Sequence, residues 1–204
     1  ADDMLATLVD WLCAVLGDQP FVLAGQSYGG YLALGLLCSR IAARVHGLML
    51  LCPVTRAGRA ERTLPPHARL VEDAALLSQP RTRAMEDFLS FAVSATTGAW
   101  ARYRDEILPG LEAGDHDFIN RFRRQGYALA CQARFSSLRY DRPALVALGR
   151  QDATVGFADA LALLNGFTRT TFAVLDGCGH NLHLDRPEPL AALTRDWLAR
   201  LQER

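Results

Sequence analysis

The pentapeptide Gly-Gln-Ser-Tyr-Gly at residues 25–29 stands between two apolar stretches of different character. Residues 21–24 form a short run typical of a strand buried on both faces, and residues 31–38 continue as an Ala- and Leu-rich helix. In this context the G-x-S-x-G pattern predicts a sharp strand-to-helix turn, with Ser27 exposed at the carboxyl edge of a sheet. We interpret Ser27 as a nucleophile. The alternative is an ordinary turn with a serine helix cap.

The same alternation of strand and helix extends along the rest of the chain. Apolar runs predict strands near residues 21–25, 45–52, 144–149 and 170–175. Helical spacing predicts helices at residues 2–16, 31–38 and near 157–164, and a last helix with Pro187 near its first turn. This pattern is typical of an α/β fold, a parallel sheet with helices on both faces. We expect the strands to pair in chain order, with the helix at 2–16 and the one after Ser27 on the same face.

The middle of the chain has a different composition. Arginine becomes frequent between residues 55 and 140, and four prolines interrupt the segment. Three to five short helices are expected there, without a notable strand pattern. We interpret residues 55–140 as a helical lid inserted after the second strand, and residues 1–54 and 141–204 as the core.

Composition excludes several classes of protein. The chain has 204 residues, half of them apolar, and its 22 basic residues, all arginine, balance 22 acidic ones. Because a nucleic-acid-binding surface needs a basic surplus, nucleic acid is not an expected partner. No apolar stretch approaches 18 residues and the first residues are acidic, so neither a membrane span nor a signal peptide is predicted. The absence of lysine suits a GC-rich bacterial coding sequence.

The five cysteines are scattered and form no C-x-x-C pair, so neither a zinc site nor a redox motif is indicated. A reduced, cytoplasmic setting is the expectation. The run Asp115-His116-Asp117 suggests a metal site only weakly, because three adjacent residues on a helix cannot all face one ion. Neither a metal nor a nucleotide cofactor is therefore expected.

A nucleophilic serine needs a base, and five histidines are available. His180 directly follows the fourth predicted strand, where side chains converge at one edge of a parallel sheet. His183 is the alternative, although a supporting or surface position suits it better. His46 precedes a strand and so belongs to the opposite edge, while His67 and His116 fall in the lid.

The base needs an orienting acid from another strand end. Asp152 follows the third predicted strand and meets this condition, although any loop aspartate can instead form a turn or cap. Asp176 is a rival, but it is close to His180 in sequence and better suited to capping its turn. No carboxylate follows the second strand, where Cys52 stands.

The order Ser27, Asp152, His180 resembles the α/β-hydrolase fold. Its nucleophile elbow is similar to residues 25–30, its acid loop to 149–152 and its histidine loop to 179–183. The spacing of lid, acid and base resembles the branch of capped esterases, lactonases and C–C hydrolases. The resemblance implies a small-molecule ester or lactone substrate, an acyl-enzyme on Ser27, and an oxyanion donor in the Tyr28 backbone N–H.

Two other functions stay open. An acyltransferase uses the same triad, and a hydrolase-like scaffold without catalysis would use the fold for binding alone. Serine at the elbow argues against haloalkane dehalogenases and epoxide hydrolases, which by family resemblance carry aspartate there. In the lid, Arg121, Arg123 and Arg124 suggest either a site for a substrate carboxylate or a solvated helix face.

The resemblance also implies about four strands before the elbow, and a second oxyanion donor from the loop after the third of them. This sequence starts at the helix that precedes the nucleophile strand. We therefore expect residues 21–24 to form a sheet edge without a charged or proline guard. The expectation is that polypeptide absent from this sequence, another chain or a second copy in a homo-oligomer covers that edge.

Overall fold

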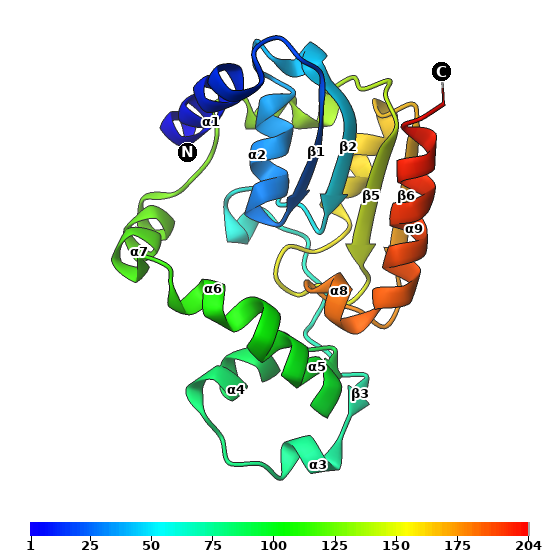
Figure 1. Ribbon diagram of the computed structural model, residues 1–204. Helices are drawn as coiled ribbons and strands as arrows, with labels where there is room; N and C mark the ends of the chain where they lie inside the picture. The colour runs from blue at the N-terminus through cyan, green and yellow to red at the C-terminus, as the bar shows by residue number, and fades with distance from the viewer. Residues whose placement is uncertain (204) are drawn as a thin grey trace.

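A four-stranded parallel sheet forms the centre of the computed structural model, which describes residues 1–203. Its strands are β1 (Phe21–Gln26), β2 (Val45–Leu51), β5 (Ala144–Gly149) and β6 (Thr170–Leu175), in the order β1-β2-β5-β6. Every pairing is parallel, so all four carboxyl ends lie at one edge of the sheet (Figure 1). The α/β fold class and the predicted pairing in chain order are confirmed.

Helices cover the two faces of this sheet. Helices α1 (Asp2–Leu16) and α2 (Tyr28–Leu36) pack together on one face, where α1 also contacts Phe21 and Leu23 of β1. Helix α9 (Pro187–Arg200) lies over the other face against β5. The side-chain alternation of β1 and β2 explains this division, because successive residues point to opposite faces.

The core lies between the sheet and these helices. All six residues of β5 are buried, which explains its uninterrupted apolar sequence. Strand β1 has a different environment, because within residues 1–203 it pairs with β2 alone. Val22 of β1 remains 53% exposed. The edge is therefore where the sequence predicts it, and its coverage by further polypeptide stays a prediction.

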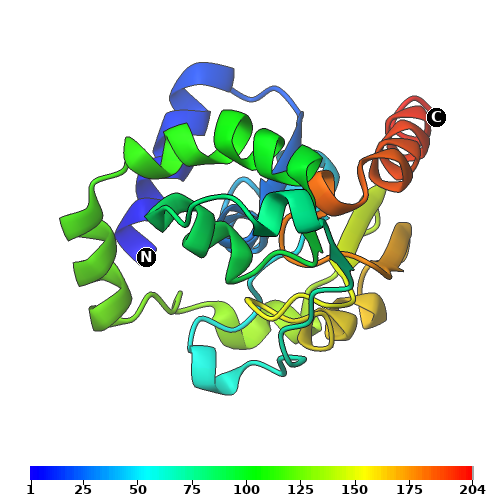
Figure 2. The same cartoon turned by 90° about the horizontal axis from the view of Figure 1, so that it is seen from below.

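Residues 55–140 contain five short α-helices that lie across the carboxyl edge of the sheet (Figure 2). They are α3 (Ala74–Leu77), α4 (Arg83–Leu89), α5 (Thr97–Arg102), α6 (Leu108–Glu112) and α7 (His116–Gln125), with a π-helical turn at Tyr103–Ile107. Their own hydrophobic cluster is built around Phe88 and Tyr103. We call this segment the cap.

Several elements differ from the predicted ones. The cap contains two short parallel strands, β3 (Val71–Glu72) and β4 (Ser94–Ala95), which were not expected because two residues carry no readable periodicity. The helix expected near 157–164 is a 3₁₀ helix at Asp159–Asn165. Helix α2 begins three residues earlier than predicted. A further helix, α8 (Leu182–Asp185), precedes α9.

Short 3₁₀ helices complete the fold at Ala42–Arg44, Arg59–Glu61 and Gln132–Ser137. Within residues 1–203, no helix has the length and apolar character that a membrane crossing requires.

Close backbone contact defines the turn between β1 and α2. A Cβ atom on Gly25 would lie 2.5 Å from the carbonyl oxygen of Gly29, and one on Gly30 would lie 2.7 Å from Cβ of Pro53. A Cβ atom on Gly29 would meet nothing within 4 Å. The turn therefore requires glycine at positions 25 and 30, because a side chain there would overlap neighbouring atoms. At position 29 a side chain would fit, since Gly29 contacts Gly25 only through its backbone.

Gly25→Ala is expected to destabilise the protein, because the new methyl group would overlap the backbone of α2. The expected loss in the free energy of unfolding is about 1–3 kcal/mol or more, measured by urea denaturation. Gly29→Ala is the matched control, and it should change stability by less than about 1 kcal/mol, in the stabilising direction. Equal losses in both variants would contradict this account of the turn.

Candidate active site

Ser27 occupies a strained position at the carboxyl end of β1. Its φ of 53° and ψ of −120° are unusual for a residue with a side chain, and such backbone strain amounts to about 1–3 kcal/mol. Hydrogen bonds hold it in place: its N–H donates to the Leu51 carbonyl at 3.0 Å, and its own carbonyl accepts from Val54 N–H at 3.0 Å. The neighbouring strand thus fixes a conformation that the serine would not adopt alone.

Helix α2 begins immediately after Ser27. The first N–H groups of an α-helix have no partner within the helix and carry the positive end of its dipole. The Tyr28 backbone N–H is the first of them, so the turn offers a donor beside the serine for an oxygen that gains negative charge. This is the position in which the sequence places an oxyanion donor.

Asp152 lies in the turn after β5 and is fully buried. Its Oδ2 accepts a hydrogen bond from His180 Nδ1 at 2.9 Å, and its Oδ1 accepts from the N–H groups of Thr154 and Val155 at 2.8 and 3.0 Å. Burial alone would raise the pKa of Asp152, but the hydrogen bonds, led by that from His180, leave the pKa below its ordinary value. Asp152 is therefore an ionised, fully hydrogen-bonded carboxylate.

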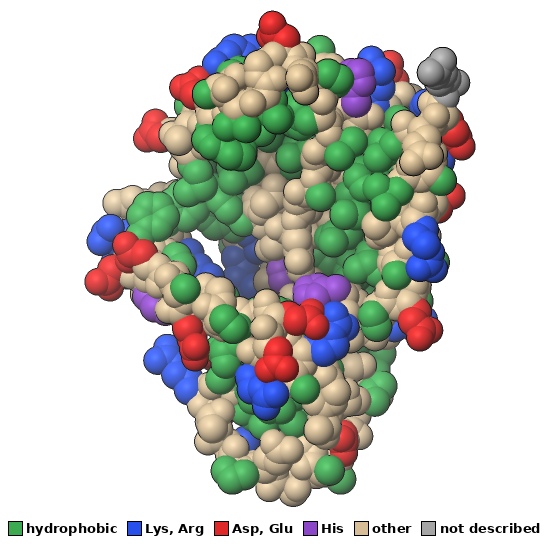
Figure 3. All heavy atoms as spheres, in the orientation of Figure 1, with side chains coloured by type: hydrophobic (Ala, Val, Ile, Leu, Met, Phe, Trp, Pro, Cys, Tyr) green, Lys and Arg blue, Asp and Glu red, His purple; other side chains and the backbone are tan. Residues whose placement is uncertain are grey.

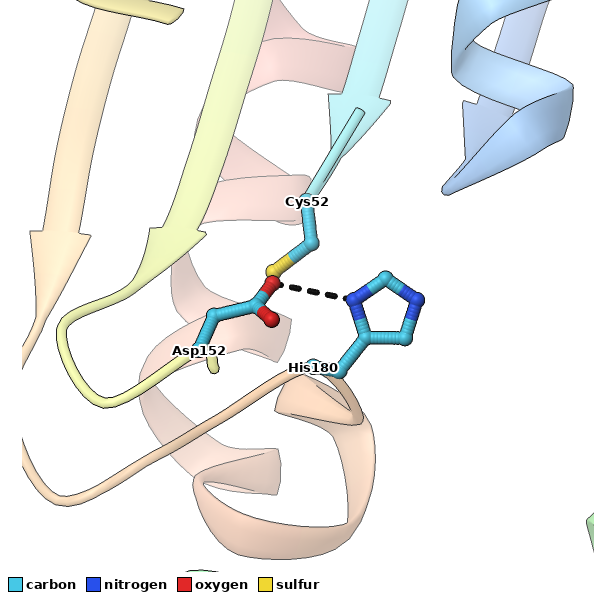
Figure 4. A group of neighbouring side chains, drawn as sticks. All are labelled: Cys52, Asp152 and His180. Atoms are coloured by element: carbon cyan, nitrogen blue, oxygen red, sulfur yellow. Dashed lines mark hydrogen bonds and ion pairs between the residues drawn. The ribbon is translucent and has the colours of Figure 1, made fainter. Parts of the chain in front are cut away.

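His180 follows β6 and presents its two ring nitrogens to different surroundings. With Nδ1–H donating to Asp152, Nε2 has a free lone pair and can accept a proton. Figure 4 shows this second nitrogen pointing away from Asp152, toward the side on which β1 and α2 lie. Gln26, the residue before Ser27, donates from Nε2 to the His180 carbonyl at 3.2 Å. The serine turn and the histidine loop are therefore neighbours.

The structure brings Asp152 and His180 into direct contact and places Ser27 at the same edge of the sheet. Among the hydrogen bonds of residues 1–203, none joins Ser27 Oγ to His180, although we expect these groups near hydrogen-bond reach. Catalytic hydrogen bonds are often long without substrate and tighten in the reacting complex. Within residues 1–203, Ser27 and His180 are therefore on neighbouring segments of one sheet edge without a direct hydrogen bond.

Cys52 completes the group of polar side chains around Asp152. Its Sγ donates to the Gly179 carbonyl at 3.6 Å, and Sγ, an Asp152 oxygen and a His180 nitrogen all lie within 4.8 Å of one another (Figure 4). A metal would need the thiolate, but burial, together with the Asp152 carboxylate, raises the pKa of the Cys52 thiol well above its usual range. The arrangement favours a hydrogen-bonded network over a metal site.

Two side chains that the sequence does not single out hold the histidine loop. Gln151 Oε1 accepts from the N–H groups of Gly177 and Cys178 at 3.0 and 3.2 Å. Asp185 in α8 accepts from Gly179 N–H at 2.9 Å and from Ser94 N–H of the cap at 3.1 Å. The only signal for Gln151 is its place beside Asp152. Nothing in the sequence links Asp185 to a cap residue 91 positions away.

The other candidates for the acid and the base lie outside this hydrogen-bonded group. Asp176 is exposed and accepts from Gln151 Nε2 at 2.8 Å rather than from His180. His46 is exposed at the start of β2, and His67 contacts the Ala92 carbonyl inside the cap. His116 opens α7 behind Asp115, whose carboxylate caps that helix by accepting from Phe118 N–H at 2.8 Å. His183 lies half-buried in α8 beside Arg102.

A cavity of about 980 Å³ opens between Ser27 and the cap. Its wall is mainly apolar, and α7 and the following loop contribute aromatic rings to it. Tyr28 packs edge-to-face on Phe122 and Tyr127, which stack on each other. Of the three lid arginines considered above, only Arg123 lines this cavity.

Comparisons with known proteins agree with this fold. A family model described as "Alpha/beta hydrolase family" matches residues 1–193. The monoacylglycerol lipase ABHD6 of Rattus norvegicus is 24% identical over 193 residues, and that of Mus musculus is 26% identical over 196. Each match covers 92% of this chain and 57% of the relative, so the chain spans little more than half the length of these curated relatives.

Solved structures show the same fold. An alpha/beta superfamily hydrolase from Oenococcus oeni PSU-1 superposes with a TM-score of 0.90 at 29% identity, over 99% of this chain and 74% of that one. A thermophilic esterase superposes with a TM-score of 0.64 at 20% identity, over 98% of this chain and 73% of that one. At that identity the esterase bears on the fold alone.

Lowering the pH is expected to destabilise the fold through His183. Burial, and after it the charge of Arg102, hold the pKa of His183 below its ordinary value; Glu106 opposes this and His180 adds to it. His183 is thus neutral in the fold, whereas an unfolded histidine binds a proton near pH 6.5. The free energy of unfolding should therefore fall as the pH drops from about 6.5 toward the folded-state pKa.

The measurement is urea unfolding at about pH 8 and about pH 5.5. His183→Gln should reduce the difference in stability between the two conditions, because its side chain does not titrate. His46→Gln, at an exposed position, is the matched control and should leave the difference as it is. An unchanged pH dependence in His183→Gln would contradict the assignment.

Proposed function

Because this chain belongs to the alpha/beta hydrolase family, we propose that Ser27, His180 and Asp152 hydrolyse a carboxylic ester or lactone through an acyl-enzyme. The observation that carries the proposal is the 2.9 Å hydrogen bond from His180 Nδ1 to the buried Asp152 carboxylate. It fixes the tautomer in which Nε2 is a base. The strained turn at Ser27 supplies the partner for that base at the same sheet edge.

The reaction begins when Ser27 Oγ attacks the substrate carbonyl and His180 Nε2 takes its proton. The carbonyl oxygen becomes an oxyanion, which accepts a hydrogen bond from Tyr28 N–H at the start of α2. Collapse of this intermediate breaks the ester bond, and the protonated His180 gives its proton to the leaving oxygen. Asp152 stabilises the imidazolium without itself becoming protonated.

Water then completes the cycle. His180 Nε2 removes a proton from a water molecule, whose oxygen attacks the acyl carbonyl, and the Ser27 oxygen leaves with the proton returned by His180. An alcohol or thiol in place of water would make the same site an acyltransferase. The proposal is hydrolysis, which needs no second organic substrate in the cavity.

The cavity supports an apolar acyl group as the part of the substrate next to Ser27. Its wall is formed largely by apolar and aromatic side chains, and it is large enough for a small organic ester. The curated relatives are named monoacylglycerol lipases, and a monoacylglycerol is an ester of glycerol with one fatty acid. We carry over only this general chemistry, an apolar acyl chain on an ester.

Labelling with a fluorophosphonate tests whether Ser27 is an activated nucleophile. The reagent should form a covalent adduct on Ser27 in the intact protein, located by mass spectrometry of peptides, and Ser27→Ala should form none. Ser39→Ala is the matched control, because Ser39 lies just beyond the far end of α2, and it should label like the wild type. Failure of the wild type to label would favour a scaffold without catalysis.

Asp152→Asn is expected to keep the fold but lower kcat for a 4-nitrophenyl ester by about 10³–10⁴-fold. The reason is that the amide no longer stabilises the imidazolium and favours the wrong tautomer of His180. Asp176→Asn, the rival acid, is the matched control and should lower kcat by less than about tenfold. Activity near the wild type in Asp152→Asn would mean that another residue is the acid.

A further inference from the structure

We propose that the preferred substrate carries a carboxylate on its apolar chain, and that Arg62 and Arg123 bind this carboxylate in the cavity beside Ser27. The inference deepens the proposed esterase function and rests on it. Three arginines line the cavity, Arg59, Arg62 and Arg123, against a single carboxylate, that of Glu61.

Hydrogen bonds hold the Arg62 side chain in place in the cavity wall. Its guanidinium donates to the carbonyls of Arg56, Thr154 and Ala57 at 2.9, 3.0 and 3.0 Å, and to the Tyr127 hydroxyl. These acceptors are all neutral, and among residues 1–203 no carboxylate lies within ion-pair distance of it. A guanidinium has five N–H donors, so one on the Nη1 nitrogen remains for a ligand.

Arg62 is hydrogen-bonded to the loop that contains Asp152. Its partner Thr154 is also bound, through its N–H, to Asp152. Arg59 reaches the same loop with longer hydrogen bonds, 3.4 Å each, to the Ala153 and Thr154 carbonyls. The positive charge is therefore held in place before any substrate arrives, which lowers the cost of binding an anion there.

Arg123 brings the second charge from the cap. It lies on α7, whose neighbouring residues Phe118, Ile119 and Phe122 form the apolar wall. Within residues 1–203 it makes no ion pair, in contrast to Arg102, which pairs with Glu106 at 2.7 Å. In the space-filling view, arginine side chains appear inside a hollow between the sheet domain and the cap, close to histidine (Figure 3).

The cavity wall has a surplus of positive charge that the whole chain does not have. The whole chain carries equal numbers of acidic and basic residues, yet the cavity wall holds three positive charges and one negative. An apolar cavity with a local positive charge is complementary to an amphipathic anion, with a hydrocarbon chain against the rings and a carboxylate against the arginines. A neutral ester would leave these charges facing the apolar chain.

Two matched pairs of esters test the proposal. In the first, mono(4-nitrophenyl) adipate is compared with 4-nitrophenyl hexanoate, which differ by a terminal carboxylate on the acyl group. In the second, 4-carboxyphenyl hexanoate is compared with phenyl hexanoate, which places the carboxylate on the leaving group. The readout is the ratio of kcat/KM, anionic over neutral, for the intact wild-type protein and for two arginine variants.

Arg123→Gln should lower this ratio roughly three- to tenfold in one of the two pairs, and that pair identifies the part of the substrate that bears the carboxylate. Arg121→Gln is the matched control: it removes the same charge from the same helix but lies outside the cavity wall, and it should leave both ratios within about twofold. Equal falls in both variants, or no fall in either pair, would overturn the proposal.

A binding measurement separates this inference from the proposed function. In the Ser27→Ala background, at least one of two anionic esters, monomethyl adipate and 4-carboxyphenyl hexanoate, should bind more tightly by calorimetry than its neutral counterpart, methyl hexanoate or phenyl hexanoate. Adding Arg123→Gln should weaken the binding of that anionic ester and leave its neutral counterpart unchanged. If no ester is hydrolysed but this preference is present, the esterase function fails while the carboxylate site stands. If esters are hydrolysed without any preference, the carboxylate site fails alone.

Discussion

The structure depends on the contact between two backbones at the β1–α2 turn. Gly25 lies so close to Gly29 that a methyl group on Gly25 would lie 2.5 Å from the Gly29 carbonyl oxygen. This contact sends the chain from the strand into the helix within one residue, and it forces Ser27 into a left-handed conformation. Ser27 is thereby placed directly before the first free N–H groups of α2.

The parallel sheet supplies the remaining groups. Because every strand runs in the same direction, the loops after β5 and β6 meet at the edge where Ser27 lies. Burial strengthens each electrostatic interaction there, so the Asp152 carboxylate must be fully paired, and its three hydrogen bonds achieve this. Gln151 and Asp185 keep the histidine loop in register with it.

A hydrogen bond also links the cap to the carboxyl edge of the sheet. Asp185 joins the loop of His180 to Ser94, so the catalytic edge and the cap share a hydrogen bond. The cap contributes aromatic rings and Arg123 to the cavity that Ser27 also lines. In the function that we propose, α7 and the segment around Arg62 select the substrate, and the residues at the sheet edge carry out the reaction.

Much of this arrangement could be predicted from the sequence, since short-range patterns determine it. The apolar runs and the glycine turn specify the strands, and parallel strand ends bring Ser27, Asp152 and His180 to one edge. The hydrogen bonds of Gln151 and Asp185 could not be predicted, because they join loops far apart in the chain and any polar side chain could have made them. The two-residue strands of the cap and the choice of Arg123 over Arg121 likewise depend on packing that periodicity does not encode.

A crystal structure of the intact protein after reaction with an alkyl phosphonate tests the central claim most directly. The account predicts phosphorus bonded to Ser27 Oγ, a phosphonate oxygen about 2.7–3.1 Å from the Tyr28 nitrogen, and His180 Nε2 within hydrogen-bond distance of the Ser27 or leaving-group oxygen. The bond from His180 Nδ1 to Asp152 should be retained. Phosphonate attached elsewhere, or a His180 ring that faces away from Ser27 in the adduct, would contradict the account.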